Sequence, residues 1–468
     1  MPDAVLEPGS FRDRSARVFY HHGEVFRALS ARALEQWEAL SATEFHARFV
    51  AQGRMIRSER VDLDMALPPG AVGWAAALRH EAVPFVSYPY EWSFGMLQDA
   101  ALLQLDLLIA ALDEGLTLKD ASAYNVQWRG TVPVFVDVAS FEKWTPGEPW
   151  MGYRQFCQLF LYPLLLVAYR DVPFHPWLRG SLEGVDAESC QKVLGVRTLL
   201  RPGVATHVYL QSRAQAACAD TMRDVRAELR AAGFNTRLIK SNARSLRKLV
   251  AGLRWRRRPS TWSEYARDHH YNDTDLATKT NFVRAAAASR PHHLAWDLGC
   301  NTGTFSRVAA NHARQVVAID GDHLAVERLY QALKAERNAT ILPLVVNLAD
   351  PSPDLGWRLL ERKQLTARGR PDLVLCLALV HHLVIGANIP LSEFLDWLAG
   401  LGADIVIEFV TREDPMVRSL LRNRDDQYAD YRLDVFEREL AARCAVVRRQ
   451  PLACETRVLY WARPRNAC

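Results

Sequence analysis

The stretch Trp296-Asp297-Leu298-Gly299-Cys300-Asn301-Thr302-Gly303-Thr304-Phe305 decides the fold of the C-terminal half of this chain. It is typical of a buried strand that ends in an acid, turns through two glycines and opens a helix. Glycine lets a backbone pass close to a ligand, and an acid at the tip of the next strand can bind the two hydroxyls of a ribose. Asp320 stands at that tip, 23 residues after Asp297 and directly after the apolar run 316–319. The pattern therefore predicts a site for a nucleoside-type cofactor.

The spacing within this loop distinguishes between cofactors. A dinucleotide fingerprint is G-x-G-x-x-G, whose second glycine makes room for a pyrophosphate at a helix N-terminus. Here Asn301 and Thr304 occupy the second and third glycine positions. The carboxylate of Asp297 would repel a pyrophosphate, but it would attract an ammonium group. S-adenosylmethionine (SAM) carries an ammonium group and a ribose but no phosphate, so the loop favours SAM over NAD or FAD.

The rest of the C-terminal half alternates strands and helices, as a doubly wound α/β domain does. We expect a helix over 322–337, buried strands over 340–346, 372–377 and 403–410, and an edge hairpin from 445–447 and 457–461. Ligands bind outside the carboxyl ends of the strands in such sheets. Asn347, Leu348 and Asp350 follow the third strand, and we expect them to border the adenine.

Several segments resemble a known group of enzymes. The D-x-G-x-N-x-G loop with its later acid resembles motifs I and II of class I SAM-dependent methyltransferases. Segments over most of the chain resemble bacterial methyltransferases related to the nodulation protein NoeA, namely 88–92, 119–125, 296–303, 377–383, 389–390, 408–410 and 458–460. Asn347 stands where such relatives are expected to have aspartate.

The resemblance implies a seven-stranded, Rossmann-like domain that binds SAM and transfers its methyl group to an acceptor that the resemblance does not identify. The methionine part of SAM would be held by Asp297, Gly299, Asn301 and Gly303, and the ribose by Asp320.

Two histidines follow the fourth strand, where an acceptor would meet the methyl group. Methyl transfer is an in-line displacement, so the enzyme aligns the acceptor and, for a hydroxyl, removes a proton. Histidine titrates near neutral pH and is the natural base. We predict His381 or His382 as the base, with one of the two facing the cleft, and Glu408 as an assisting acid or a turn cap. The alternative is that both histidines are structural.

The N-terminal half contains a second motif. Asp120-Ala-Ser-Ala-Tyr-Asn125 gives D-x-x-x-x-N, and Asp137 follows 12 residues after Asn125. Protein kinases use this arrangement for a catalytic base and two metal ligands. However, no lysine precedes Lys119, and only an arginine such as Arg14, Arg17 or Arg27 could substitute for the phosphate-binding lysine of a kinase. We predict a non-catalytic α+β kinase-like domain with Asp120, Asn125 and Asp137 as candidate nucleotide or metal ligands. An unrelated fold with a chance match stays open.

Length and composition limit the class of protein and the number of domains that the chain can form. The chain has 468 residues, 49% hydrophobic and 24% charged, which is ordinary for a soluble protein of two or three domains. The N-terminus lacks the pattern of a signal peptide. The longest apolar run, 156–169, is shorter than the roughly 20 residues that span a bilayer. The eight cysteines show neither a C-x-x-C pair nor zinc-site spacing, so we expect reduced thiols, no metal and a cytoplasmic location.

The formal net charge of +5 is unevenly distributed, because arginine is concentrated over 244–258. Such a run contacts nucleic acid, anionic lipid or an acidic partner, or it forms a solvated face at a domain junction. We favour the junction. The expected organisation is a kinase-like domain over 1–236, a basic linker over 237–260 and a methyltransferase domain over 261–468.

The sequence thus predicts a methyltransferase that uses SAM and acts on a hydroxyl of a small molecule, sugar or secondary metabolite, with a biopolymer acceptor left open. Two alternatives remain. The first is a phosphotransferase of atypical kinase fold, dependent on ATP and Mg²⁺, with a SAM-sensing domain. The second is a non-catalytic scaffold.

Overall fold

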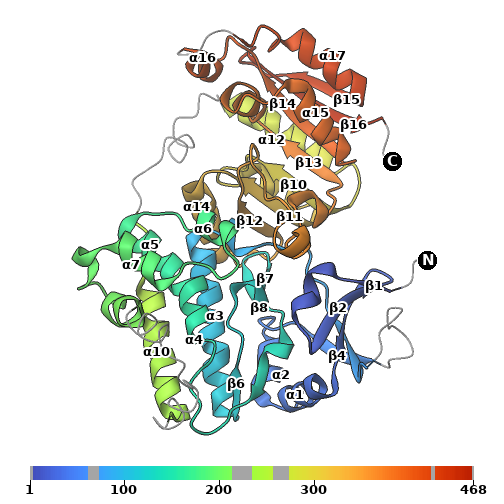
Figure 1. Cartoon of the computed structure of the whole chain (residues 1–468). Helices are drawn as coiled ribbons and strands as arrows, with labels where there is room; N and C mark the ends of the chain where they lie inside the picture. Colours follow the sequence, from blue (N-terminus) through green and yellow to red (C-terminus); the bar gives the residue numbers. More distant parts are fainter. Residues whose placement is uncertain (1–3, 62–72, 213–233, 257–272, 423–426, 466–468) are drawn as a thin grey trace. The chain divides into compact units, whose positions relative to one another are not determined.

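The computed structural model of the chain (Figure 1) describes residues 4–61, 73–212, 234–256, 273–422 and 427–465. The chain divides into two compact units. The first comprises residues 1–257 and 355–362, and the second comprises 258–354 and 363–468. Within the first unit, Arg12 pairs with Glu361 at 2.8 Å, and Arg362 donates a hydrogen bond to the hydroxyl of Tyr124 at 3.1 Å. The short stretch 355–362 therefore belongs with the N-terminal unit.

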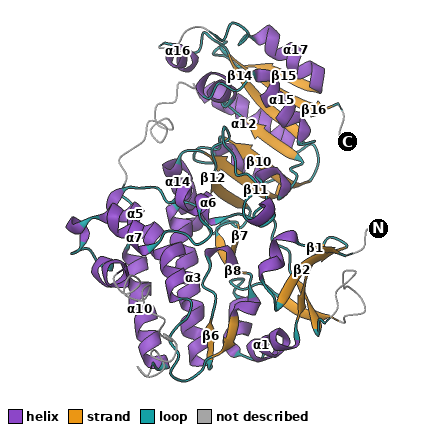
Figure 2. Cartoon of the chain, viewed as in Figure 1, coloured by secondary structure: helices purple, strands orange, loops and turns teal. Residues whose placement is uncertain are grey.

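The C-terminal unit is built on a seven-stranded sheet (Figure 2). The strands lie in the order β12-β11-β10-β13-β14-β16-β15. The first five are parallel to one another, and β16 runs antiparallel to its two neighbours β14 and β15. Their bounds are β10 (His292–Leu298), β11 (Ala313–Asp320), β12 (Ile341–Val345), β13 (Leu373–Cys376), β14 (Asp404–Val410), β15 (Cys444–Pro451) and β16 (Arg457–Pro464). This is the strand order of the class I methyltransferase fold, so the predicted seven-stranded, doubly wound sheet with its edge hairpin is confirmed.

Helices cover both faces of this sheet. Residues of α12 (Asp273–Ala287), α13 (Thr304–Ala310) and α14 (His323–Ala335) share one core cluster with the central strands. The remaining helices are α15 (Leu391–Gly400), which contacts α17 (Leu433–Arg443), and α16 (Pro415–Leu421). Every residue of β12 and β14 is buried, as expected of strands covered on both faces.

The strand order also fixes where a ligand can bind. The chain runs outward from β10 through β11 to β12, and then crosses back to β13 on the other side of β10. Such a reversal opens a crevice at the carboxyl ends of the two central strands. The loop after β10 and the histidines after β13 both lie at these strand ends.

The N-terminal unit begins with a five-stranded antiparallel sheet in the order β1-β2-β3-β5-β4. Its elements are β1 (Val5–Leu6), β2 (Ala16–His21), β3 (Glu24–Leu29), α1 (Ala31–Ser41), α2 (Glu44–Ala51), β4 (Ser58–Val61) and β5 (Ala76–His80). A mainly helical part follows. It contains α3 (Phe94–Asp113), β6 (Leu116–Leu118), the hairpin of β7 (Val126–Arg129) and β8 (Val132–Phe135), β9 (Phe141–Lys143), α4 (Tyr153–Phe156), α5 (Tyr162–Arg170), α6 (His175–Gly180) and α7 (Ala187–Leu194). The α+β composition is as expected, and the kinase-like assignment stays a prediction.

One helix of the described chain, α3, is long and apolar enough to cross a membrane by length and composition. Within the structure, however, 72% of its apolar window is buried, which is typical of the core helix of a globular unit. The apolar run 156–169 forms α4, a π-helical turn and α5, and it too is largely buried. The six described cysteines are free thiols.

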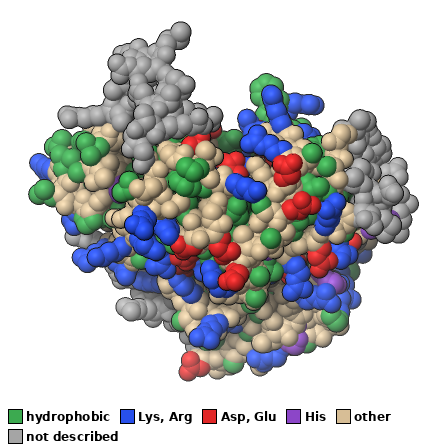
Figure 3. Space-filling view, turned by 90° about the horizontal axis from the view of Figure 1, so that it is seen from below, with side chains coloured by type: hydrophobic (Ala, Val, Ile, Leu, Met, Phe, Trp, Pro, Cys, Tyr) green, Lys and Arg blue, Asp and Glu red, His purple; other side chains and the backbone are tan. Residues whose placement is uncertain are grey.

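The segment expected to be a basic linker is largely a helix of the N-terminal unit. Helix α10 (Thr236–Gly252) packs against α3 through Ile239, Leu246 and Val250, which recur at helical spacing. Its basic residues lie on the outer face, where Arg247 Nε contacts Asp106 Oδ1 at 2.6 Å. The apolar residues of this helix recur at helical spacing, but the many arginines between them made the pattern hard to recognise in the sequence. Lys and Arg side chains are interspersed with acidic ones on the face seen in Figure 3. Arg257 and Arg258 lie outside the described residues.

Candidate functional site

The loop after β10 owes its shape to three residues with left-handed backbone. Gly299, Asn301 and Gly303 have φ values of +75°, +49° and +78°. A Cβ atom on Gly303 would lie 2.6 Å from Leu329 Cδ1, so this position requires glycine both for its backbone and for space. Asparagine is among the few other residues that adopt this conformation readily. The G-x-N-x-G pattern is therefore a backbone requirement of the turn that leads into α13.

Asp320, at the tip of β11, holds this loop in place. Its Oδ2 accepts a hydrogen bond from Asn301 N at 2.8 Å, and its Oδ1 accepts one from Asp322 N at 2.8 Å. Burial raises the pKa of Asp320, against the effect of these backbone hydrogen bonds. Each carboxylate oxygen has two lone pairs, so Asp320 keeps the capacity to accept further hydrogen bonds from a ligand.

Asp297 lies in β10 and is only 2% exposed. Its Oδ2 accepts a hydrogen bond from Ser306 Oγ, in the first turn of α13, at 2.5 Å. Burial raises the pKa of Asp297 to about 6, and the negative charge of Asp320 adds to this effect while Ser306 opposes it. The carboxylate form of Asp297 is thus disfavoured until a cation comes close.

The side chain of Asn301 presents an unusual atom at the same place. Its Oδ1 is buried and has no hydrogen-bond partner among the residues that the structure describes. Buried amide oxygens are nearly always bonded, so such an atom indicates a ligand or an ordered water. Asn301 also gives its backbone N–H to Asp320, and it therefore joins the two strand ends.

The turn after β12 lies beside this pair of strands. A Cβ atom on Gly321 would lie 3.8 Å from Asn347 Cα. The Oδ1 of Asn347 accepts a hydrogen bond from Ala349 N at 3.0 Å, and its carbonyl oxygen accepts one from Asp350 N at 3.0 Å. Asparagine and aspartate both cap such turns, which explains why asparagine can replace the expected acid. Leu348 is half-buried, and Asn347 and Asp350 are exposed.

The two histidines after β13 lie in different surroundings. His381 is fully buried, and in the described part of the chain neither ring nitrogen has a hydrogen-bond partner. His382 is half-buried, and its ring centroid lies 4.0 Å from that of His381. Burial lowers the pKa of His381 well below its usual range and that of His382 to about 4. Both imidazoles are therefore neutral near pH 7, and of the two only His382 is reachable from solvent.

Glu408, at the end of β14, is fully buried in an ion-pair network. Its Oε2 lies 2.7 Å from Lys279 Nζ on α12, and its Oε1 lies 3.5 Å from a guanidinium nitrogen of Arg457. Arg457 also contacts Asp414 at 2.8 Å. Two carboxylates and two cations thus neutralise one another. These contacts favour an anchoring role for Glu408 over that of an assisting acid.

The sequence analysis selected Glu408 but did not predict this network around it. Lys279 lies three and four positions before the buried residues Phe282 and Val283, on the face of α12 that packs on the sheet. A lysine on the core face of a helix indicates a buried acid on a neighbouring element, because an unpaired buried charge is strongly destabilising. That spacing was the available signal, although it could not identify Glu408 as the partner.

The residues selected in the N-terminal half also come together. Ser140 Oγ accepts a hydrogen bond from Asn125 Nδ2 at 3.2 Å and donates one to Asp137 Oδ2. Asp137 also pairs with Arg27 of β3. Burial and the charge of Asp137 raise the pKa of Asp120. In the residues described, no three His, Cys, Asp or Glu side chains are grouped as a metal site.

Comparison with known proteins gives one match over nearly the whole chain. The chain is 33% identical over 455 residues to the nodulation protein NoeA of Rhizobium meliloti (strain 1021), covering 97% of this chain and 94% of that protein. No family model matches the chain.

Many solved structures resemble part of the chain, two of them being NodS and WbdD. The N-methyltransferase NodS from Bradyrhizobium japonicum WM9, in complex with S-adenosylhomocysteine, is 13% identical with a TM-score of 0.32, covering 44% of this chain and 100% of NodS. The bifunctional kinase-methyltransferase WbdD is 21% identical with a TM-score of 0.30, covering 43% of this chain and 41% of WbdD.

The buried ion pair of Lys279 and Glu408 gives a test of the anchoring network. Lys279→Met should lower the free energy of unfolding of the C-terminal unit by about 3–5 kcal/mol, because Glu408 keeps a buried charge without its nearest cation. The double variant Lys279→Met/Glu408→Gln should recover most of that loss. Urea unfolding followed by circular dichroism measures both.

The matched control is Arg432→Met, which removes an exposed pair with Asp434 and should cost about 0–1 kcal/mol. A loss for Lys279→Met no larger than that of the control would contradict the role assigned to the network.

Proposed function

This chain belongs to the family of the nodulation protein NoeA, and from its strand-end site we propose that it is a SAM-dependent methyltransferase. One observation carries the proposal. At the reversal point of a class I methyltransferase sheet, the buried Asp297 and the half-buried Asp320 on neighbouring strands flank a glycine turn whose amide oxygen has no hydrogen-bond partner among the described residues. A ligand with one cation, one ribose and no phosphate matches these groups.

The residues of the site fit SAM, which when bound supplies a methyl group on a sulfonium. The carboxylate of Asp297 attracts the ammonium group, and the buried Oδ1 of Asn301 accepts a hydrogen bond from the ligand. Gly299 and Gly303 keep the backbone close to the methionine part, and Asp320 binds the ribose hydroxyls with its remaining lone pairs. Asn347, Leu348 and Asp350 border the adenine at the end of β12.

The acceptor is a hydroxyl group, and His382 is its base. A base must reach the proton that it removes, and His382 is half-buried whereas His381 is fully buried. The imidazole of His382 is neutral near pH 7, so it can accept a proton. His381 lies against it and orients its ring. Glu408 fixes α12 to β14 through Lys279 and takes no part in proton transfer.

The acceptor molecule is a small molecule, sugar or secondary metabolite of the cytoplasm, in preference to a nucleic acid bound at the outer face of α10. Part of that face is neutralised by acids of α3, as in the contact of Lys240 Nζ with Asp113 at 2.5 Å. Incubation with methyl-labelled SAM and a fractionated host extract, followed by identification of the labelled product, tests this assignment. Label in RNA rather than in a small molecule would overturn it.

The first test of the cofactor assignment removes the side chain that is proposed to bind the ribose. Asp320→Ala should weaken SAM binding at least tenfold, because it removes the acceptor for the ribose and releases the Asn301 loop. Isothermal titration calorimetry measures the dissociation constant. The control is Asp354→Ala, which removes a half-buried acid beyond β12 that accepts a hydrogen bond from Gln364 N. Equal affinity of Asp320→Ala and the wild type would be incompatible with the proposed site.

The raised pKa of Asp297 predicts a pH dependence of SAM binding. The folded protein binds a proton at Asp297 below about pH 6, whereas an ordinary aspartate does so only below about pH 4. That proton must leave before the ammonium group binds. SAM affinity should therefore fall as the pH drops from about 7 to about 5, approaching tenfold per pH unit below pH 6.

Calorimetry over this pH range measures the effect. Asp297→Asn, which cannot ionise, should bind SAM weakly and with an affinity that does not change over the same range. A wild-type affinity that is constant between pH 5 and pH 7 would show that Asp297 does not meet the ammonium group.

The two histidines give a test of the proton transfer. His382→Ala should lower kcat by about 10²–10⁴ and leave SAM affinity unchanged, because it removes a base but no cofactor contact. His381→Leu should keep the larger part of kcat and should not destabilise the fold, because neither ring nitrogen of His381 is bonded in the described chain. Steady-state assays with the identified acceptor measure both variants. The opposite order of kcat values would assign the base to His381.

A further inference from the structure

Helix α10 carries a line of basic side chains on its outer face. Its inner face, which packs against α3, is formed by buried residues that recur at helical spacing. Arg237, Arg244 and Lys248 each stand two residues before one of these buried residues, and two residues correspond to a rotation of about 200° around a helix. The three side chains therefore lie opposite the inner face, on a line about 16 Å long. We call this line the basic stripe.

The charge of the basic stripe is not neutralised by the described part of the chain. Its three residues are exposed, and none of them forms an ion pair with a described residue. By contrast Lys240 and Arg247, at the edge of the same helix face, pair with acids of α3 at 2.5 and 2.6 Å. Arg254 and Arg256 follow the helix, are exposed, and form no ion pair with a described residue either. This face therefore offers unbalanced positive charge to an anionic partner.

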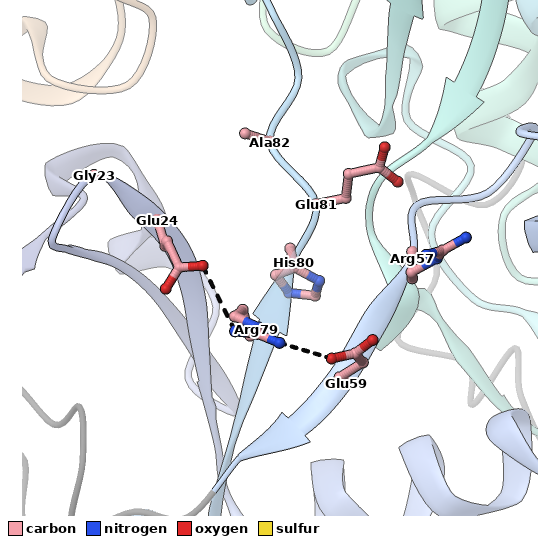
Figure 4. Close-up of a pocket in the computed structure, with 8 residues that line it drawn as sticks. All are labelled: Gly23, Glu24, Arg57, Glu59, Arg79, His80, Glu81 and Ala82. Carbon is pink, nitrogen blue, oxygen red and sulfur yellow. Dashed lines mark hydrogen bonds and ion pairs between the residues drawn. The ribbon is translucent and has the colours of Figure 1, made fainter.

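Arg79, in the antiparallel sheet of the same unit, shows the opposite arrangement (Figure 4). It lines a pocket at the end of β5 and points between two glutamates. It pairs with Glu59 at 2.9 Å and with Glu24 at 3.6 Å. The charge of Arg79 is thus balanced within the protein, whereas the charge of the basic stripe is not.

Exposed apolar side chains lie beside one flank of α10. The chain at Gly203 packs on Leu249 of α10, because a Cβ atom on Gly203 would lie only 2.3 Å from Leu249 Cδ2. Close to this contact in the chain, Leu200 is 99% exposed and Val196 is 71% exposed. Leu238 stands three helical turns before Leu249, on the same flank, and is 56% exposed. Exposed apolar side chains grouped in this way mark an interaction surface.

Basic side chains also accompany the apolar ones. Arg197 and Arg201 stand on either side of Leu200 in the chain, are exposed, and form no ion pair with a described residue. A surface that combines unpaired cations with exposed leucine and valine matches the headgroup region of an anionic bilayer. There the lipid phosphates attract the cations, and the boundary of the acyl chains accepts the apolar side chains.

The exposure of Leu200 favours a membrane over a nucleic acid as the partner. The phosphates of RNA or DNA would also attract the basic stripe. However, contact with phosphates gives an exposed leucine no apolar surface to enter. Stacking on bases needs aromatic side chains, and α10 contains none. Only the bilayer surface uses both the cations and the apolar side chains.

We propose that the basic stripe of α10, together with the exposed side chains around Leu200, docks this chain on a membrane surface of anionic lipid. The contact is peripheral. The cations meet lipid phosphates, and Leu200 and Val196 enter the headgroup region without crossing the bilayer. This inference does not rest on the proposed methyl transfer, because no residue of the strand-end site contributes to it.

Co-sedimentation of the full chain with lipid vesicles tests the proposal. Vesicles of phosphatidylglycerol are the anionic probe, and vesicles of phosphatidylcholine are the neutral one. The chain should bind phosphatidylglycerol about tenfold more tightly or better, since each basic side chain near an anionic surface strengthens binding about fivefold. Added salt should weaken this binding, because it screens the charges.

Variants locate the docking surface. The triple variant Arg237→Gln/Arg244→Gln/Lys248→Gln should weaken binding to phosphatidylglycerol about tenfold or more. Leu200→Ser should weaken it about threefold or more, because the side chain that enters the headgroup region is lost. All four side chains are exposed, so the variants should fold as the wild type does, and circular dichroism checks this.

The matched control is the triple variant Arg314→Gln/Arg337→Gln/Arg370→Gln. It removes the same net charge from exposed arginines of the C-terminal unit. Its affinity for phosphatidylglycerol should stay within about twofold of the wild type, because only charges close to the lipid surface contribute strongly.

Two results would overturn the proposal. The first is equal binding to both kinds of vesicle, or a control variant that loses as much binding as the variant of the basic stripe. The second is a single-stranded RNA that displaces the vesicles at an equal concentration of phosphate, with lipid binding unchanged in Leu200→Ser, which would assign the stripe to nucleic acid. Failure of SAM binding would contradict the proposed methyltransferase function and not this docking surface.

Discussion

The carboxylate of Asp320 joins the ends of two parallel strands, and the candidate cofactor site depends on this junction. It accepts the backbone N–H of Asn301 from the loop after β10 and that of Asp322 from the start of the next helix. Backbone hydrogen bonds from Gly299 N and Cys300 N to the carbonyl oxygen of Ile319 hold the start of the loop, and the Asp320 carboxylate holds Asn301, the one residue of the loop other than glycine with left-handed backbone. One side chain thus sets the shape of the turn and presents an acceptor to a ligand.

The second constraint is charge. Asp297 is a buried acid and Asp320 a half-buried acid on neighbouring strands, and loss of solvation raises the pKa of each. A ligand with a positive charge would reduce the repulsion between these two carboxylates. The neutral network of Lys279, Glu408, Arg457 and Asp414 solves the same problem inside the protein, because it pairs every buried charge with an opposite one. The acids at the cofactor site form no ion pair within the described part of the chain, whereas the acids of the anchoring network each have a cation beside them. This difference in charge balance distinguishes the residues that bind a ligand from those that anchor the fold.

The fold of the C-terminal unit could be predicted from the sequence because its strands are covered on both faces and appear as short apolar runs between turn residues. The residues at the strand ends could also be identified from the sequence, since glycines and an acid at this fixed spacing are typical of few kinds of binding site. Contacts between distant elements could not be predicted. The partner of Lys279 on β14, and the contact of Arg27 with Asp137, depend on packing across 129 and 110 residues of chain.

Composition also misled in one place. The arginines after residue 237 hid an amphipathic helix, because their charge is more conspicuous than the buried apolar residues on its inner face.

The most direct measurement of the central claim is a crystal structure of the full chain grown with S-adenosylhomocysteine. The account predicts the ligand at the carboxyl ends of β10 and β11, with its ribose hydroxyls within hydrogen-bond distance of Asp320 and its amino group nearest to Asp297. A ligand bound elsewhere on the chain, or a ribose that does not contact Asp320, would contradict it.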